Sequence, residues 1–477
     1  MTADGFQKTV LPSGVTVVSE TMPDRRSVAA GVWVRCGSRD EPAELLGISH
    51  FLEHMVFKGT ERRDARAIAA SLESLGGHLD AFTAREEVCY YARALAEHLP
   101  DAIDVLADIA SRPLLAPHEV DREKSVVREE IFSCEDNPED KINDLLSEQV
   151  WGGHALGRPI LGTVETVDRI SSESLRGFFS RRYRGEALVV AASGGLDHAQ
   201  LVALVDEHLK PCDGEPMALS EPPPPFAPSL FHEARADLQQ LYLALGTRGV
   251  GFGDPRRYPL VVLNTLLGAG MSSRLFQSVR EEAGLAYSVF SAADFHRDAG
   301  LLSVQLGVAP ERGREALQRV REELEALVEN GPTEDEVASA RSQLKGTILM
   351  AQESVSSRMS HIAHEEIYRG GYTTREDQVA RVLAVTRDQV VEAAREFLRP
   401  ERFVLTAIGP ASGGPLTEAD WPIDHASGTA TAEPTFSRHA LRSSRRKGTK
   451  LEDPTNTLGS VGDAAAAKPQ GPAKPAN

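Results

Sequence analysis

The chain has 477 residues, of which 41% are hydrophobic and 26% charged, so it is long enough for two to four domains with substantial cores. Its formal net charge of -18 argues against nucleic-acid binding, which needs clustered Lys and Arg; the charge is compatible with attraction of cationic peptides and equally with solubility alone. No stretch approaches the roughly 18 consecutive apolar residues that a membrane helix needs, so we expect no membrane segment.

The N-terminus and the cysteines predict the compartment. Residues 1–8 show no basic segment followed by an apolar run, so we expect no secretory signal. The four cysteines are isolated and lack C-x-x-C spacing, which favours reduced, partly buried thiols. We therefore expect a cytoplasmic protein.

The first hundred residues alternate between strands and helices. Five runs rich in β-branched and aromatic residues predict strands, at 9–11, 15–18, 28–35, 78–83 and 88–93. Between them, Asp64 is expected to cap a helix that stops at Gly76-Gly77. Mixed strands with helices between them indicate an α+β class, with helices packed on one face of a mostly antiparallel sheet.

The motif His50-Phe51-Leu52-Glu53-His54 carries the main chemical signal. Histidines four residues apart lie on one face of a helix, so their imidazoles can converge on one metal ion. Glu53 lies on the adjoining part of that face, where its carboxylate can reach a metal-bound water. The order H-x-x-E-H reverses H-E-x-x-H and is typical of inverted zincins. Because such a pentapeptide arises by chance in roughly a few per cent of chains this long, the motif alone is a hypothesis.

A third metal ligand is expected from a second helix, at 120–131. Zinc in a hydrolase needs three protein ligands and an open position for water. Glu123 and Glu130 are seven residues apart and share a helix face, whereas Glu129 points elsewhere. We predict Glu130 as the ligand and Glu123 as a support that orients a ligand histidine or the base. Without the upstream motif, solvated glutamates on an amphipathic helix would be the favoured interpretation.

The body of the chain repeats itself at an offset of 215 residues. Residues 170–194 predict a capped helix, a turn and a strand, and residues 385–409 give the same pattern without a gap. Ser171 and Thr386 are the paired N-caps. A period of this length suits duplicated domains rather than a solenoid.

The metal site is expected in only one copy. Pro117, just before the Glu123 helix, corresponds to Pro332, before a helix that ends near Met350. In that second copy the counterparts of Glu123 and Glu130 are not carboxylates. The duplicate is therefore expected to keep the architecture without the metal site.

Four consecutive prolines, 222–225, mark the boundary between the two homologous domains, because they form a stiff, extended spacer. We predict an N-terminal zinc-binding domain, a Pro-rich linker, a C-terminal homologous domain without a metal site and a disordered tail, at residues 1–214, 215–228, 229–420 and 421–477. The tail is rich in Ser, Thr, Ala, Pro, Gly and Lys and has few large apolar residues.

Together these features resemble the M16 family of zinc metallopeptidases, also called pitrilysin- or insulinase-like. The similarity is greatest to the M16B branch, which contains mitochondrial processing peptidase and its bacterial relatives. It runs over most of residues 8–410 and is carried by the motifs at 50–60, 76–86, 122–130 and 156–162. The resemblance implies one zinc ion per chain, with Glu53 as the general base and Glu123 in its supporting role. The zinc ligands that it implies are His50, His54 and Glu130.

The resemblance also implies two substrate-binding elements. The strand around Asp80, Ala81 and Phe82 would be an exposed edge that pairs with the substrate backbone, so that main-chain hydrogen bonds bind many sequences. The family often has Asn where this chain has Asp80, and a carboxylate there would weaken one side-chain hydrogen bond to the peptide. Asp140 and Asp144 lie where processing peptidases hold a substrate arginine; plain exposed acids are the alternative for this pair.

An Arg and a Tyr seven residues apart reach the zinc site from the C-terminal domain in this family, and Arg280 and Tyr287 match that pair. Arg280 would anchor the substrate backbone, and Tyr287 would donate a hydrogen bond to the oxyanion. In heterodimeric relatives the zinc motif and the Arg/Tyr pair are divided between subunits. Their presence in one chain implies a self-sufficient enzyme, and by analogy with this branch we expect a homodimer.

The predicted function is that of a zinc-dependent endopeptidase that cleaves unfolded or short peptides, or presequence-like segments. The alternative is a non-catalytic peptide-binding or scaffold subunit of a processing-peptidase-like complex, and the complete metal and Arg/Tyr sets argue against it. A different metallohydrolase would instead turn over small esters or phosphates and show no peptidase activity. Neither nucleic acid nor a membrane is expected as a partner.

Overall fold

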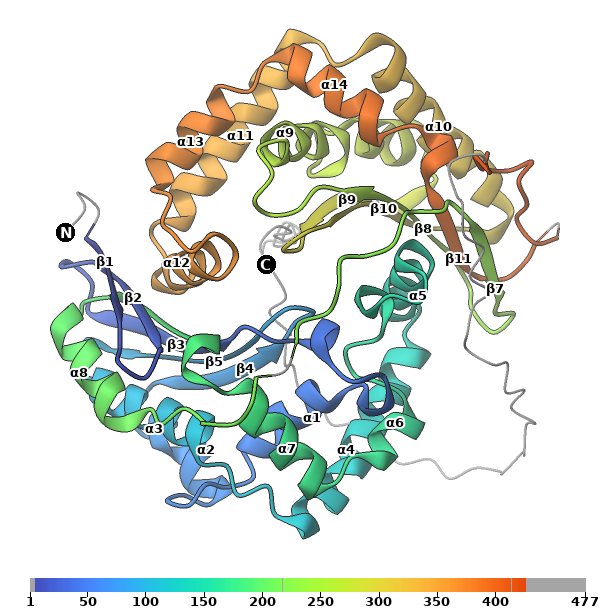
Figure 1. Ribbon diagram of the computed structural model, residues 1–477. Coiled ribbons are helices and arrows are strands. Elements are labelled where there is room, and N and C mark those ends of the chain that lie inside the picture. Colours follow the sequence, from blue (N-terminus) through green and yellow to red (C-terminus); the bar gives the residue numbers. More distant parts are fainter. Residues whose placement is uncertain (1–4, 217, 413, 426–477) are drawn as a thin grey trace, which may run out of the picture. The chain divides into compact units, whose positions relative to one another are not determined.

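Two β-sheets, one in each half of the sequence, organise the chain in the computed structural model (Figure 1). The structure describes residues 5–216, 218–412 and 414–425. Most of the predicted tail, from residue 426 on, lies outside the described residues. Trp421, which the prediction placed in the tail, is instead fully buried, and its indole N–H donates to the carbonyl of Pro400.

The N-terminal sheet has six strands in the order β1-β2-β6-β3-β5-β4. Only β2 and β6 pair in parallel, so the sheet is mostly antiparallel as predicted. Strand β4 lies at its edge, paired with β5. The strands are Phe6–Val10 (β1), Thr16–Thr21 (β2), Ser27–Val34 (β3), His78–Thr83 (β4), Val88–Leu95 (β5) and Leu188–Gly194 (β6).

The C-terminal sheet repeats this plan with five strands in the order β7-β11-β8-β10-β9. Its one parallel pair, β7 with β11, occupies the place of β2 with β6, and β9 takes the edge position of β4. The strands are Leu230–Ala234 (β7), Leu241–Gly249 (β8), Ala286–Phe295 (β9), Gly300–Val308 (β10) and Val404–Gly409 (β11).

Each half also supplies helices, and all of them except α5 and α12 stay with their own half. Those of the N-terminal half are Ile48–Val56 (α1), Ala65–Glu73 (α2), Leu99–Ser111 (α3), Pro117–Asp136 (α4), Pro138–Trp151 (α5), Val164–Arg169 (α6), Ser172–Arg182 (α7) and His198–His208 (α8). Those of the C-terminal half are Arg257–Gly268 (α9), Gly313–Asn330 (α10), Glu334–Ala351 (α11), Val355–Arg369 (α12), Arg375–Leu383 (α13) and Arg387–Phe397 (α14), with a π-helical stretch at Phe276–Glu282 (η6). No helix in the described part of the chain is both long enough and apolar enough to cross a membrane.

Short 3₁₀ helices join several of these elements. They are Ser38–Asp40 (η1), Ala43–Leu45 (η2), Ala96–His98 (η3), Ala155–Gly157 (η4), Gly185–Ala187 (η5), Pro310–Arg312 (η7) and Pro400–Arg402 (η8).

The internal duplication appears at the level of single caps. The hydroxyl of Ser171 caps α7 and that of Thr386 caps α14, 215 residues later, each as part of a capping box. Helices α4 and α11 form a second matching pair. At the positions in α11 that lie 215 residues after Glu123 and Glu130, the chain has Ala338 and Lys345. The second copy therefore lacks both carboxylates of α4.

The second face of each sheet is covered by a helix from the other half, which the sequence did not predict (Figure 1). Helix α12 packs Met359, Ile362 and Ala363 onto the N-terminal sheet, against the fully buried Trp33. Reciprocally, α5 packs its apolar face onto β8, β10 and β11 of the C-terminal sheet. Both contacts bury apolar side chains that would otherwise face water, so they tie the two halves together.

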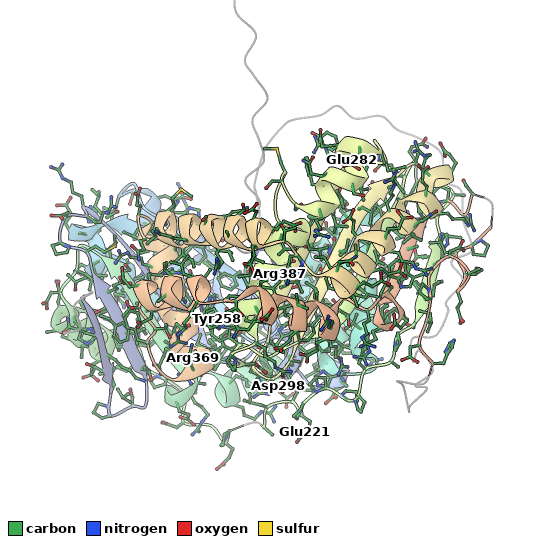
Figure 2. The ribbon with its side chains drawn as sticks, turned by 90° about the horizontal axis from the view of Figure 1, so that it is seen from above. Glu221, Tyr258, Glu282, Asp298, Arg369 and Arg387 are labelled. Atoms are coloured by element: carbon green, nitrogen blue, oxygen red, sulfur yellow. The ribbon has the colours of Figure 1, made fainter. Side chains whose placement is uncertain are left out.

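A buried charge network joins the halves at the tip of the β9–β10 hairpin. Arg39, in η1, is fully buried and donates to Glu86 at 2.6 Å and to both carboxylate oxygens of Asp298 at 2.7 Å. Its other donors reach the hydroxyl of Ser220 and the carbonyl of Glu221 in the connection between the halves. Figure 2 labels two of the residues that supply acceptors, Glu221 and Asp298. All five N–H groups of the guanidinium thus have an acceptor, and the acceptors come from three separate segments.

Replacing Arg39 by alanine should destabilise the protein strongly, because Glu86 and the groups around it would stay buried without their cation. We expect the free energy of unfolding to fall by about 3 kcal/mol or more in urea denaturation. Arg62→Ala is the matched control, because Arg62 pairs with Asp104 at the surface and is expected to contribute less than about 1 kcal/mol. Equal, small losses in the two variants would contradict a structural role for the network.

Candidate metal centre

Helix α1 presents its two histidines opposite an apolar face. Ile48, Phe51, Leu52 and Met55 are buried in the core of the N-terminal half, which fixes the rotation of the helix. The helix begins after Gly47, whose φ of 87° and close approach to the carbonyl of Leu161 leave no room for a side chain. The motif at 156–162 therefore packs against the start of the metal helix.

A buried carboxylate caps this helix. Glu41, in the loop after β3, accepts hydrogen bonds from the backbone N–H groups of Gly47, at 2.7 Å, and Ser49, at 2.8 Å. Burial raises the pKa of Glu41 to about 8, although the same two N–H groups act to lower it. The N-cap position is a glycine with no side chain to offer, so the cap comes from a distant residue.

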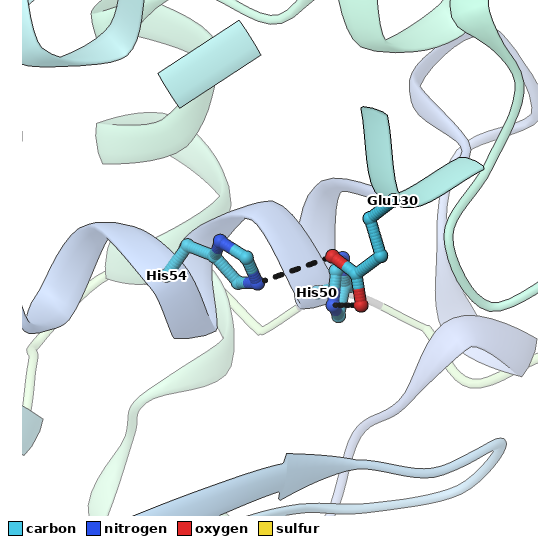
Figure 3. A group of neighbouring side chains, drawn as sticks. All are labelled: His50, His54 and Glu130. Atoms are coloured by element: carbon cyan, nitrogen blue, oxygen red, sulfur yellow. Dashed lines mark ion pairs between the residues drawn. The ribbon is translucent and has the colours of Figure 1, made fainter. Parts of the chain in front are cut away.

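Three ligand atoms converge between α1 and α4 (Figure 3). The Nε2 atom of His50 lies 3.6 Å from one carboxylate oxygen of Glu130, and the Nε2 atom of His54 lies 3.5 Å from the other. One ligand atom from each residue lies within 4.8 Å of the other two. His50 and His54 have ring centroids 4.6 Å apart, as expected for residues one helical turn from each other.

The donor set fits a zinc ion. Two ligand atoms of a tetrahedral zinc, each about 2.1 Å from the metal, are separated by about 3.4 Å. The 3.5 and 3.6 Å separations at Glu130 are close to this value and longer than a usual hydrogen bond. Burial alone would raise the pKa of Glu130, but interaction with His50 and the charge of His54 outweigh it and lower the pKa. The Glu130 side chain is 40% exposed, so the centre is open on one side for water or substrate.

Glu123 supports the centre from the predicted position. Its carboxylate lies 2.9 Å from Nδ1 of His54, which fixes the ring and leaves Nε2 facing Glu130. The other oxygen of Glu123 lies 2.7 Å from the ammonium of Lys58. Burial acts to raise the pKa of Glu123, but His54 and Lys58 outweigh it and lower the pKa. Glu123 therefore orients a ligand histidine.

Glu53 lies beside the ligands and is partly buried. Its carboxylate accepts a hydrogen bond from the hydroxyl of Thr83, at the end of β4. Burial raises the pKa of Glu53, against the charges of His50 and His54 and the Thr83 hydrogen bond, which lower it. A carboxylate with a raised pKa next to metal ligands suits a general base.

The proposed substrate strand is β4, which lies at the sheet edge as the resemblance implies. Asp80 is exposed, and its carboxylate accepts from the N–H of Ala81 at 2.8 Å and from the hydroxyl of Tyr91 at 3.1 Å. Phe82 lies on the same face of the strand as Asp80, with its ring 6.3 Å from the Tyr91 ring. The edge is therefore close to the metal centre at its Thr83 end, because Thr83 contacts Glu53.

Arg280 and Tyr287 are brought together in the C-terminal half. The Arg280 guanidinium lies 5.0 Å from the centre of the Tyr287 ring. Tyr287 is 82% exposed at the start of β9, in the C-terminal half. Within the described residues, neither side chain forms a hydrogen bond or ion pair with the metal ligands or with Glu53.

Asp140 and Asp144 lie on α5, the helix that follows α4 directly in the sequence. Asp140 is exposed and accepts a hydrogen bond from the side chain of Asn137. Burial raises the pKa of Asp144, although the charge of Arg85 acts to lower it. Burial, and then the charges of Asp140, Asp144, Glu130 and Glu135, raise the pKa of Cys134 on α4.

Comparison with known proteins decides the family. The model "Insulinase (Peptidase family M16)" matches residues 16–164, and "Peptidase M16 inactive domain" matches residues 169–344. An "uncharacterized zinc protease" of Streptomyces coelicolor is 40% identical over 85% of this chain and 89% of its own length. The chain belongs to the M16 peptidase family.

A further relative is similar in sequence, and two solved structures share the fold. An "uncharacterized zinc protease" of Bacillus subtilis is 38% identical over 84% of this chain and 98% of its own length. A protease from Helicobacter pylori shares the fold, with a TM-score of 0.81 and 21% identity over 85% of this chain and 99% of that one. A structure named as a peptidase M16 inactive domain, from Pseudomonas fluorescens, gives a TM-score of 0.79 at 22% identity, covering 85% and 98%.

Sequence reasoning missed three residues of the M16 site. Thr83 stood in a quoted motif without a role, because its contact with Glu53 joins positions 30 residues apart. Lys58 follows the metal helix, and its pairing with Glu123 depends on how α4 packs. Glu41 has no sequence signal of its own; the one available hint is that Gly47 cannot cap α1 with a side chain.

Replacing Glu130 by glutamine should strongly weaken zinc binding, because the amide keeps the shape and loses the charge. The loss of affinity, measured by competition with a chelator, should exceed the roughly 10- to 100-fold typical of a residue that only supports a ligand. Glu129→Gln, at the exposed neighbouring position on α4, should leave zinc affinity unchanged. Equal zinc binding by both variants and the unaltered protein would remove Glu130 from the ligand set.

Proposed function

We propose that this M16 protein is a zinc-dependent endopeptidase that cleaves unfolded peptides or presequence-like segments, with one zinc ion per chain. The observation that carries the proposal is the convergence of His50, His54 and Glu130, with Glu53 beside them. The names of its relatives support a zinc protease in general. The unpaired state of all four cysteines supports the cytoplasm as its place of action.

The residues divide the chemistry between them. When bound, zinc supplies Lewis-acid catalysis and makes water a stronger nucleophile at neutral pH. Glu53 would take the proton of the attacking water on its carboxylate and deliver it to the leaving amine. Glu123 and Lys58 would hold His54 in one orientation throughout, since their contacts do not involve substrate.

The substrate would bind along β4. An edge strand offers free main-chain groups, which recognise a peptide backbone with little regard for its sequence. Asp140 and Asp144, near Glu130, would favour a basic side chain next to the cleaved bond. The net charge of -18 would attract such cationic peptides at longer range.

Glu53→Gln tests the mechanism directly. The variant should retain zinc, because Glu53 is not a ligand, and lose peptide hydrolysis by about 10²- to 10⁴-fold in kcat, because the proton acceptor is gone. Mass spectrometry of products from a mixed peptide library, with and without chelator, measures the loss. Full activity in this variant would end the mechanism, and absence of stoichiometric zinc from the unaltered protein would favour the scaffold function.

The position of Tyr287 supports a homodimer. The β9–β10 tip contacts the N-terminal half, where the N–H of Arg297 donates to Glu86, three residues after Thr83. Tyr287 lies at the other end of β9, about 26 Å along the strand from Phe295. No hydrogen bond or ion pair within the described residues joins Tyr287 to the metal ligands of its own chain, and its side chain is 82% exposed and available to a partner. We therefore propose that Arg280 and Tyr287 complete the site of a second copy of the chain.

Mixing two inactive variants tests this arrangement. Glu53→Gln chains lack the base, and Tyr287→Phe chains lack an oxyanion donor, which is expected to cost about 10²- to 10³-fold in kcat. After subunit exchange, half of the dimers combine one chain of each kind, and each of these has one complete site. Peptidase activity should then rise to about a quarter of that of the unaltered enzyme. Activity no higher than the mean of the two variants would contradict a shared site.

A further inference from the structure

We propose that Thr83 is a positioning residue for Glu53. The turn that follows Thr83 supports it in this role, because the C-terminal half holds that turn in place. The proposal rests on the proposed peptidase function for its kinetic consequences. Its structural part concerns the orientation of one carboxylate and stands independently of any substrate.

The contact that carries the proposal is the hydrogen bond from the Thr83 hydroxyl to Oε2 of Glu53. A hydroxyl that donates to a carboxylate forms a charge-assisted bond and favours the ionised acceptor. Because one oxygen of Glu53 is held in this way, the other is left to face the reacting water. Glu53 is partly buried, which limits the access of solvent to this carboxylate.

The backbone at Thr83 is fixed on both sides. Thr83 pairs with Val88 across the β4–β5 ladder. The turn between them is closed by the N–H of Ala84, which donates to the carbonyl of Glu87 at 2.8 Å. A second contact holds the turn from outside, where the N–H of Ser38 donates to the carbonyl of Ala84 at 3.1 Å. The Thr83 hydroxyl therefore projects from a rigid support.

The two acids of this turn contact the C-terminal half. Glu86 is buried and accepts from Arg39 and from the N–H of Arg297, at the tip of the β9–β10 hairpin. Glu87 is also buried and lies 2.8 Å from Nε2 of His364, on α12. The half without metal ligands thus holds the turn through two separate elements, and the turn holds the residue that contacts the base.

One strand would then serve two purposes. Strand β4 is the proposed template for the substrate backbone, and its last residue orients the base. Strand β4 would then fix the positions of both the scissile carbonyl and the Glu53 carboxylate, which keeps the water between them aligned for attack. Thr83 itself touches neither the metal ligands nor the scissile bond, so its effect would pass through Glu53.

Thr83→Val and Thr83→Ser test the proposal as a matched pair in the full-length, zinc-loaded protein. Valine keeps the shape and removes the hydroxyl, whereas serine keeps the hydroxyl. We expect Thr83→Val to lower kcat about 10- to 100-fold, the effect of losing a hydrogen bond to a charged group, with KM and zinc content little changed. Thr83→Ser should retain most of the activity. Equal losses in the two variants would overturn the proposal, because the hydroxyl would not be the cause.

The Glu53→Gln background separates positioning from a general structural effect. If Thr83 acts through Glu53, adding Thr83→Val to Glu53→Gln should cause little further loss in the residual rate. A further loss as large as that in the unaltered enzyme would overturn the proposal.

Crystal structures of the two zinc-loaded variants supply a readout without turnover. The Glu53 side chain should change rotamer in Thr83→Val and keep it in Thr83→Ser. An unchanged Glu53 in Thr83→Val would overturn the proposal. If the unaltered protein cleaves no peptide while Glu53 moves in Thr83→Val as expected, the peptidase function fails and the positioning role stands.

Discussion

The burial of one guanidinium constrains most of this structure. Arg39 is removed from water, so each of its five N–H groups must find an acceptor, and the fold supplies them from the β4–β5 turn, the β9–β10 tip and the connection between the halves. Satisfying this single group brings three distant segments to one point. Two of these segments, the turn and the tip, are directly connected to the strands that carry Thr83 and Tyr287. The turn leads to Thr83 and Glu53, and the tip lies at the end of β9, the strand that carries Tyr287.

The metal centre depends on fewer long-range contacts than the groups around it do. Both histidines come from one helical turn, and Glu130 and Glu123 come from one face of a second helix, so packing two helices assembles the ligands and their support. The orientation of the base depends on the sheet, and the sheet edge depends on the other half. The family description of residues 169–344 as an inactive domain agrees with the structure, because the metal-ligand cluster found in the described part of the chain takes no residue from that range. The C-terminal half of this chain nevertheless contacts the β4–β5 turn, which lies beside Glu53.

The sequence predicted features that depend on spacing along one element. Helical periodicity placed His50 and His54 together, and a seven-residue interval placed Glu123 and Glu130 on one face; the structure brings all four to one centre. The N-caps at Ser171 and Thr386 depend on local hydrogen bonds, and both are confirmed.

What escaped prediction depends on long-range packing. The apolar residues of α5 and α12 are compatible with packing on either sheet, and the amino-acid pattern does not say which sheet each helix covers. The same holds for Thr83 and Glu41, whose partners are set by tertiary structure. The location of Tyr287 could not be read from its motif, because the motif gives a spacing to Arg280 and no direction in space.

The reciprocal packing of α5 and α12 has the geometry of a domain-swapped pair. Helix α12 lies about 217 residues after α5 in a chain whose halves repeat at 215, so the two helices are equivalent members of the duplication. Taken apart, either half would lose the helix that covers the second face of its own sheet, and the apolar side chains there would face water. Each half therefore depends on the other to complete its core.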